Sequence, residues 1–128
     1  MQRREIPEEV LRFIERRIDS VPHLEALLLL RENPEKPWSD GDIAARVYVS
    51  RERAQIILAD LVRHGLISAG AAPATYSYNG AWDEEQLMDK VAAAYGKQLV
   101  HVASLIHAKS ASEAVRDFAR AFRLKDED

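Results

Sequence analysis

The chain has 128 residues, a formal net charge of −3 and no cysteine. This length suits one domain, large enough to bury roughly two-thirds of the surface of its unfolded chain. The absence of cysteine excludes disulfides and thiol chemistry and fits a reducing cytoplasm. The slightly acidic balance argues against strong, sequence-independent binding to DNA, which depends on neutralising phosphates with lysine and arginine.

Membrane insertion and export are not expected. The longest apolar run, residues 26–30, is far too short to cross a bilayer. Residues 1–10 lack the apolar core of a signal peptide. We therefore expect a cytoplasmic protein that does not associate with membranes.

Two helices are predicted at the N-terminal end. Residues 7–19 form the first, since Pro7 suits a first turn and Glu8 and Glu9 lie at its positive end. Residues 20–22 interrupt it. Residues 23–32 form the second helix, which is apolar nearly all round and therefore typical of the centre of a core. Two prolines in residues 33–37 prevent that helix from continuing.

Residues 38–67 predict a helix, a tight turn and a second helix. Ser39 and Asp42 have the spacing of a capping box, and Ser50 suits the start of the second helix. Gly65 suits its left-handed C-terminal end. The apolar positions repeat at helical spacing: Ile43, Ala44 and Val47 in the first helix, and Ala54, Ile57, Leu58, Leu61 and Val62 in the second. We expect Leu61 to be fully buried against residues 26–30.

The C-terminal half predicts two short strands followed by helices. Residues 66–69 and 75–78 have strand character, and residues 70–74 form the loop between them. Asp83 and Gln86 have capping-box spacing, so one long helix is predicted from residue 83 to about residue 108. Such a helix would extend about 39 Å at ~1.5 Å per residue, which suggests packing beyond its own domain. A break at Gly96 is the alternative. A last helix is predicted from Ser110.

Residues 43–67, IAARVYVSRERAQIILADLVRHGLI, resemble the helix-turn-helix of winged-helix regulators, most closely the MarR-like group. The resemblance implies a mainly α fold: a winged helix-turn-helix with a two-stranded β-wing and N- and C-terminal dimerisation helices. Residues 1–128 would then form a single winged-helix domain. Residues 1–20 would hold the N-terminal helix, residues 21–80 the winged-helix core, and residues 81–128 the C-terminal helices of the dimer interface. The matching positions are Ile43, Ala44, Val47, Val49, Ser50, Arg51, Leu61, Arg63, Gly65, Leu66 and Ile67.

The leading hypothesis for function is a DNA-binding transcriptional regulator that acts as a homodimer on double-stranded DNA. Arginine and glutamine are the side chains that pair with guanine and adenine edges in the major groove. In the second helix of the motif the candidate DNA-binding residues are Ser50, Arg51, Arg53, Gln55 and Arg63. The resemblance also leaves open a small-molecule sensor, although no residue identifies a ligand.

The alternative hypothesis is a winged-helix protein–protein interaction module, or adaptor, that does not bind DNA. Ile56 and Ala59 create an apolar face on the second helix, where related regulators often carry polar or basic residues. Residues 68–79, the predicted wing, contain no lysine or arginine. An uncharged, apolar surface suits a protein partner better than a phosphate backbone.

Enzymatic activity is not predicted, and neither is a metal site or a cofactor. The four histidines, at positions 23, 64, 101 and 107, do not have the spacing of a zinc-binding helix. The sequence has no glycine-rich phosphate loop and no nucleophile elbow. Asp40 and Asp42 lie at a helix start, where negative charge is stabilising on structural grounds alone.

Overall fold

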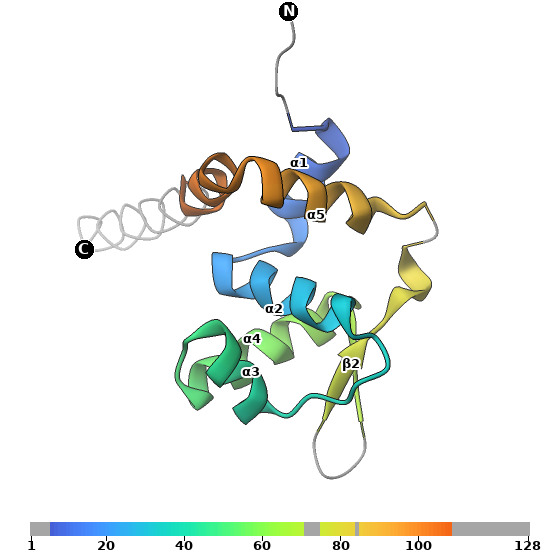
Figure 1. The fold of residues 1–128 in the computed structure, drawn as a ribbon, viewed down its shortest axis with the longest axis vertical. Helices are drawn as coiled ribbons and strands as arrows, with labels where there is room; N and C mark the ends of the chain where they lie inside the picture. Colours follow the sequence, from blue (N-terminus) through green and yellow to red (C-terminus); the bar gives the residue numbers. More distant parts are fainter. Residues whose placement is uncertain (1–5, 71–74, 84, 109–128) are drawn as a thin grey trace, which may run out of the picture.

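The computed structural model describes residues 6–70, 75–83 and 85–108. This part of the chain is mainly helical and contains a two-stranded antiparallel sheet (Figure 1). Residues 99–108 are also helical. None of the described helices is long and apolar enough to cross a membrane. The elements, in chain order, are α1 (Glu8–Arg17), α2 (Val21–Glu32), α3 (Asp40–Val47), α4 (Arg51–Arg63), β1 (Ile67–Ala69), β2 (Tyr76–Tyr78), the 3₁₀ helix η1 (Gly80–Trp82) and α5 (Leu87–Lys97).

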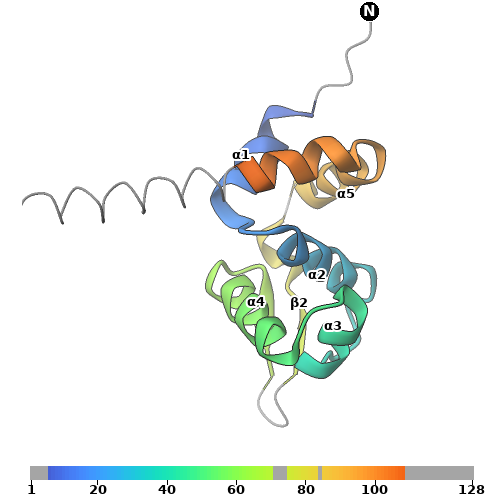
Figure 2. The same ribbon diagram turned by 90° about the vertical axis from the view of Figure 1, so that its left-hand side faces the viewer.

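Helix α2 is the centre of the fold. It contacts α3, α4 and β2 on one side, while α1 and α5 pack on each other at the other end of the molecule (Figures 1 and 2). Leu24, Leu27 and Leu30 of α2 are completely buried. Leu61 of α4 is also completely buried, as the sequence predicts. An apolar helix in this position lets three neighbouring elements share one hydrophobic core.

The predicted helix starts at Ser39 and Ser50 are confirmed. The hydroxyl of Ser39 accepts the backbone N–H of Asp42 at 3.1 Å, and the Asp42 carboxylate accepts the N–H of Ser39 at 3.3 Å. The hydroxyl of Ser50 accepts the N–H of Arg53 at 3.0 Å. Gly65 follows α4 with φ +76°, in the left-handed region that favours glycine. Local capping therefore determines where α3 and α4 begin and where α4 ends.

The sheet is small and antiparallel. Ile67 pairs with Tyr78, and Ala69 pairs with Tyr76. Trp38 extends the pairing, because its N–H donates to the carbonyl of Tyr76 at 2.8 Å and its own carbonyl accepts the N–H of Tyr76 at 2.7 Å. The side chain of Trp38 is 1% exposed. This bridge holds the segment just before α3 against β2.

The prediction of one long helix over residues 83–108 is wrong. Helix α5 begins at Leu87 and ends at Lys97, because Gln98 leaves the helical conformation with φ −131° and ψ 50°. A second helical segment follows over residues 99–108. The break lies close to Gly96, the alternative position. The capping box is also absent, since Gln86 is left-handed at φ 59°. Asp83 instead accepts the N–H groups of Leu87 at 2.6 Å and Met88 at 2.9 Å.

The boundaries of the N-terminal helices differ less from the prediction. Helix α1 is shorter than predicted, and α2 begins two residues earlier, because the hydroxyl of Ser20 accepts the N–H of His23 at 3.3 Å and so caps its start. The predicted last helix, from Ser110, lies outside the described residues. Val102 and Ile106 are buried in the chain's own core, whereas Leu99 is 50% and Val100 is 77% exposed.

Candidate functional site

The candidate DNA-binding residues lie at the surface of α4 and at its N-cap. Ala54, Ile57, Leu58 and Leu61 are buried and anchor the helix to the core. The opposite face is exposed. It carries Arg51, Glu52, Arg53, Gln55, Ile56, Ala59 and Arg63, and Ser50 precedes it as an exposed cap. The helical spacing of the apolar residues alone dictates this division between the two faces.

Asp40, at the start of α3, binds two of the candidate residues. One carboxylate oxygen of Asp40 accepts a hydrogen bond from Nε of Arg51 at 3.1 Å, and the other accepts one from Nε2 of Gln55 at 2.8 Å. The bond from Gln55 lowers the pKa of the Asp40 carboxyl, assisted by the charge of Arg51 and opposed by partial burial. The side chain of Asp40 is only 19% exposed. Asp40 therefore offers a negative charge directly beside the N-terminal half of α4.

The arginines of α4 differ in their contacts. Arg51 pairs with Asp40, and Nη2 of Arg63 lies 2.9 Å from Oδ1 of Asp60. Among the described residues, the guanidinium of Arg53 has no hydrogen-bond or ion-pair partner. Arg53 is thus the cation of the α4 surface that can bind an external group without losing an internal one.

Apolar side chains accompany these charges. Ile56 is 52% exposed, and Ala59 is exposed one turn further along α4. Tyr48, in the turn between α3 and α4, is 91% exposed and has φ 61°. A bulky residue in the left-handed region stores strain of roughly 1 kcal/mol or more. The described residues of the predicted wing, 68–70 and 75–79, contain no lysine or arginine, and residues 71–74 lie outside the described part of the chain.

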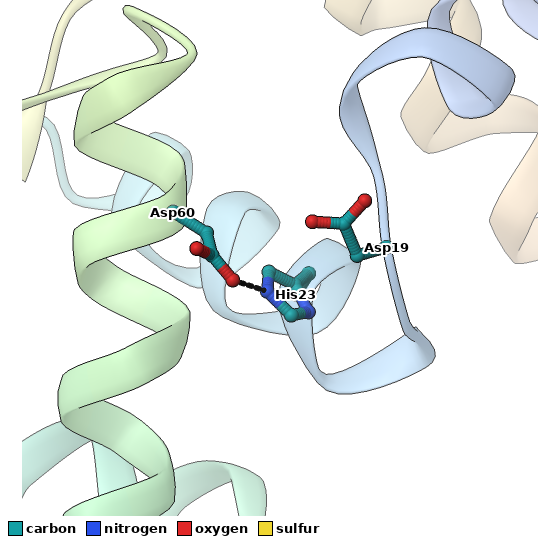
Figure 3. Close-up of side chains that lie close together, drawn as sticks. All are labelled: Asp19, His23 and Asp60. Atoms are coloured by element: carbon teal, nitrogen blue, oxygen red, sulfur yellow. Dashed lines mark hydrogen bonds and ion pairs between the residues drawn. The ribbon is translucent and has the colours of Figure 1, made fainter. Parts of the chain in front are cut away.

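A second polar cluster lies between α2 and α4 (Figure 3). Nε2 of His23 lies 2.8 Å from Oδ2 of Asp60, and Nδ1 of His23 lies 2.6 Å from Oγ of Ser20. The His23 side chain is 3% exposed and that of Asp60 is 18% exposed. Burial tends to raise the pKa of Asp60, but the hydrogen bonds from His23 and Arg63 outweigh it and lower that pKa. Sequence analysis missed this cluster, because no spacing pattern connects positions 23 and 60.

A cleft of 430 Å³ opens between α1, η1 and the start of α5. Phe13 and Trp82 stack in its lining with ring centroids 5.6 Å apart, and the guanidinium of Arg17 lies 5.5 Å from the centroid of the Trp82 ring. Arg12 and Arg16 also line the cleft. The volume falls in the range of small-molecule sites. The cleft is one of several places where the described residues offer space to a small ligand.

Comparisons with known proteins address only the fold. The sequence matches no protein-family model, and no curated protein matches it. A solved structure, that of the ST1889 protein from the thermoacidophilic archaeon Sulfolobus tokodaii, is similar with a TM-score of 0.52 at 20% sequence identity. The similarity covers 73% of this chain and 93% of the archaeal chain. At this identity the match supports a shared arrangement of helices and strands and carries no function.

Proposed function

We propose that the protein is a DNA-binding transcriptional regulator with a winged helix-turn-helix, in which α4 is the recognition helix. The observation that carries the proposal is the exposed face of α4. It follows a tight turn and a serine cap, and it presents the side chains of Arg51, Arg53, Gln55 and Arg63 to solvent. A capped helix with guanidinium groups on its outer face has the shape and chemistry that the major groove accepts.

The contacts of α4 suggest a division of roles. Arg53 has no internal partner among the described residues and lies in the first turn of α4, where recognition helices contact base edges. Arg51 and Arg63 are 72% and 64% exposed and would bind phosphates. Phosphate binding by Arg51 must compete with Asp40. We therefore expect a modest contribution from Arg51 in the wild-type protein and a larger one when the Asp40 charge is removed.

Homodimerisation is part of the proposal. A symmetric dimer would place two copies of α4 on the half-sites of a palindrome. Leu99 and Val100 support this, because they are large, exposed apolar side chains on the helical segment 99–108. Exposed apolar side chains of this size are typical of surfaces covered by a partner. The dimer interface would lie within residues 81–128.

The test is selection of bound duplexes from a random pool, followed by titration of the enriched sequence against salt. Arg53→Ala should cost roughly 1–3 kcal/mol for that sequence and relax its specificity. Asp40→Asn should strengthen binding to every duplex and steepen the salt dependence by up to about one unit of slope, because Arg51 becomes available to a phosphate. Asp42→Asn is the matched control, since Asp42 also lies in the first turn of α3 but makes no hydrogen bond or ion pair with the described residues of α4.

A second function, a protein-interaction adaptor, is favoured by a different observation. Tyr48 and Ile56 are strongly exposed apolar side chains, while Asp40 already neutralises Arg51. Large exposed apolar residues beside paired charges suit a protein partner. Ile56→Lys separates the two functions, because it adds a positive charge that should strengthen DNA binding at low salt but should abolish docking of a protein on the Ile56–Ala59 face.

The outcomes are decisive for the DNA-binding proposal. If no sequence is enriched and wild-type affinity is weaker than about 10⁻⁴ M at physiological salt, the regulator proposal fails. The adaptor would then be pursued by pull-down with Ile56→Lys as the negative control. Weaker DNA binding by Asp40→Asn, with binding by Asp42→Asn unchanged, would contradict the role given to Arg51.

A further inference from the structure

Three metal-ligating side chains meet between the α1–α2 link, the first turn of α2 and α4 (Figure 3). Asp19, His23 and Asp60 each offer one ligand atom, and these atoms all lie within 4.8 Å of one another. We infer that this cluster, the His23 site, binds a divalent transition-metal ion such as Zn²⁺. The ligands are Nε2 of His23 and one carboxylate oxygen each of Asp19 and Asp60.

The distances suit an ion of this size. Two ligands of one Zn²⁺, each about 2.1 Å from the metal, lie roughly 3.0–3.4 Å apart. Nε2 of His23 and Oδ2 of Asp60 are 2.8 Å apart, so a small separation of these atoms admits the ion. The Asp19 carboxylate stands beside the ring of His23 (Figure 3). The ligand atoms of the three residues lie within 4.8 Å of one another, so small side-chain movements bring them into one shell, which water completes to four ligands.

Ser20 provides the outer contact that metal-bound histidines require. An ionised carboxylate only accepts hydrogen bonds, so without metal Nε2 of His23 carries the hydrogen and donates to Asp60. Nδ1 then accepts from the Ser20 hydroxyl at 2.6 Å. When a metal occupies Nε2, the hydrogen moves to Nδ1, which donates to Oγ of Ser20. A ligand histidine is normally held in this way by a partner on its other ring nitrogen.

The charge and chemistry of the His23 site select the type of ion. Two carboxylates and an imidazole form a mixed oxygen and nitrogen ligand set that suits a divalent cation, and Arg63 already pairs with one of the carboxylates. Imidazole suits zinc and its neighbours, whereas calcium and magnesium prefer oxygen ligands alone. Oδ1 of Asp60 keeps its ion pair with Arg63 at 2.9 Å, and Oδ2, which contacts His23 without metal, becomes the metal ligand. Partial burial of Asp60 shields the site from bulk water.

The inference is independent of the proposed DNA binding. Its ligands come from segments far apart in the sequence, because Asp19 lies between α1 and α2 and Asp60 lies on α4. A bound ion would therefore cross-link these segments whatever partner occupies the outer face of α4. The competing explanation is that the bond between His23 and Asp60 serves only to tie α2 to α4 without metal.

The experiment uses the untagged, metal-free, full-length chain and Zn²⁺ alone, measured by isothermal titration calorimetry. We expect one ion per chain with micromolar or tighter affinity. Asp19→Asn should weaken binding at least about tenfold, and it leaves the bond between His23 and Asp60 in place, so the metal-free tie is preserved. Asp60→Asn should weaken binding similarly. His101→Gln and His107→Gln alter exposed histidines and should leave the affinity unchanged.

A second measurement reports on the His23 ring itself. Nitrogen-15 spectra of the imidazole distinguish the two tautomers, and zinc should convert His23 from the Nε2–H to the Nδ1–H form. Three results would each overturn the inference: no saturable binding of Zn²⁺, equal affinity in wild type and a folded Asp19→Asn variant, or an Nε2–H tautomer that persists at saturating zinc. If Asp19→Asn does not fold, Asp60→Asn and the wild-type tautomer decide the question.

Discussion

Replacement of Leu61 by alanine tests how α4 is rotated on the core. Leu61 is completely buried, and α4 contacts both α2 and β1. The substitution removes three carbon atoms from this environment and leaves a cavity that the helices fill only in part. We expect a loss of about 2–5 kcal/mol in the free energy of unfolding, from the transfer of the missing atoms and the residual cavity. Since domains are stable by only about 5–15 kcal/mol, this is a large fraction of the total.

The measurement is urea unfolding followed by circular dichroism, with Ile56→Ala as the matched control. Ile56 lies on the same helix but is 52% exposed, so its truncation should change stability by less than about 0.5 kcal/mol. The m-value should be unchanged in both variants, because the surface exposed on unfolding hardly differs. A loss below about 1 kcal/mol for Leu61→Ala, or equal losses in the two variants, would refute the packing of α4 described above.

Three further predictions concern charge, assembly and strain. Asp60→Asn should destabilise the protein by about 1.5–3 kcal/mol at neutral pH, since it weakens charge-assisted hydrogen bonds to His23 and Arg63. The folded-state pKa of Asp60 lies below its ordinary value of 3.8. In urea unfolding, the stability difference between wild type and Asp60→Asn should therefore be constant above pH 3.8, and it should be lost as the pH falls through the folded-state pKa of Asp60. Val100→Asp should shift a dimer toward monomer in light scattering without unfolding it, whereas Val102→Asp should unfold the chain because Val102 is 1% exposed; the reverse pattern would contradict their placement. Tyr48→Gly should raise the thermal midpoint slightly, because it relieves a left-handed φ of 61° at a position that is 91% exposed, and a lower midpoint would show that the Tyr48 side chain contributes to the fold.

Features that depend on neighbouring residues were predictable from the sequence. The caps at Ser39 and Ser50, the left-handed glycine at position 65 and the buried Leu61 follow from hydrogen bonding and helical periodicity within a few residues. The same periodicity indicates which side chains of α4 are exposed. Periodicity failed in α5, where an apolar stripe continues across a change in backbone direction at Gln98.

Only the tertiary structure decided which distant side chains meet. The sequence identifies Asp40 only as an acidic residue that stabilises the start of a helix. Packing of α3 on α4 brings its carboxylate to Arg51 and Gln55. No pattern in the sequence distinguishes His23 from the other histidines. Packing of α2 on α4 places its ring against Asp60, 37 positions later in the chain. The sequence by itself therefore determined α3, α4 and their apolar faces, because these depend on local hydrogen bonds and spacing. The electrostatic environment of α4 and the His23 site depend on how the helices pack, which local pattern does not specify.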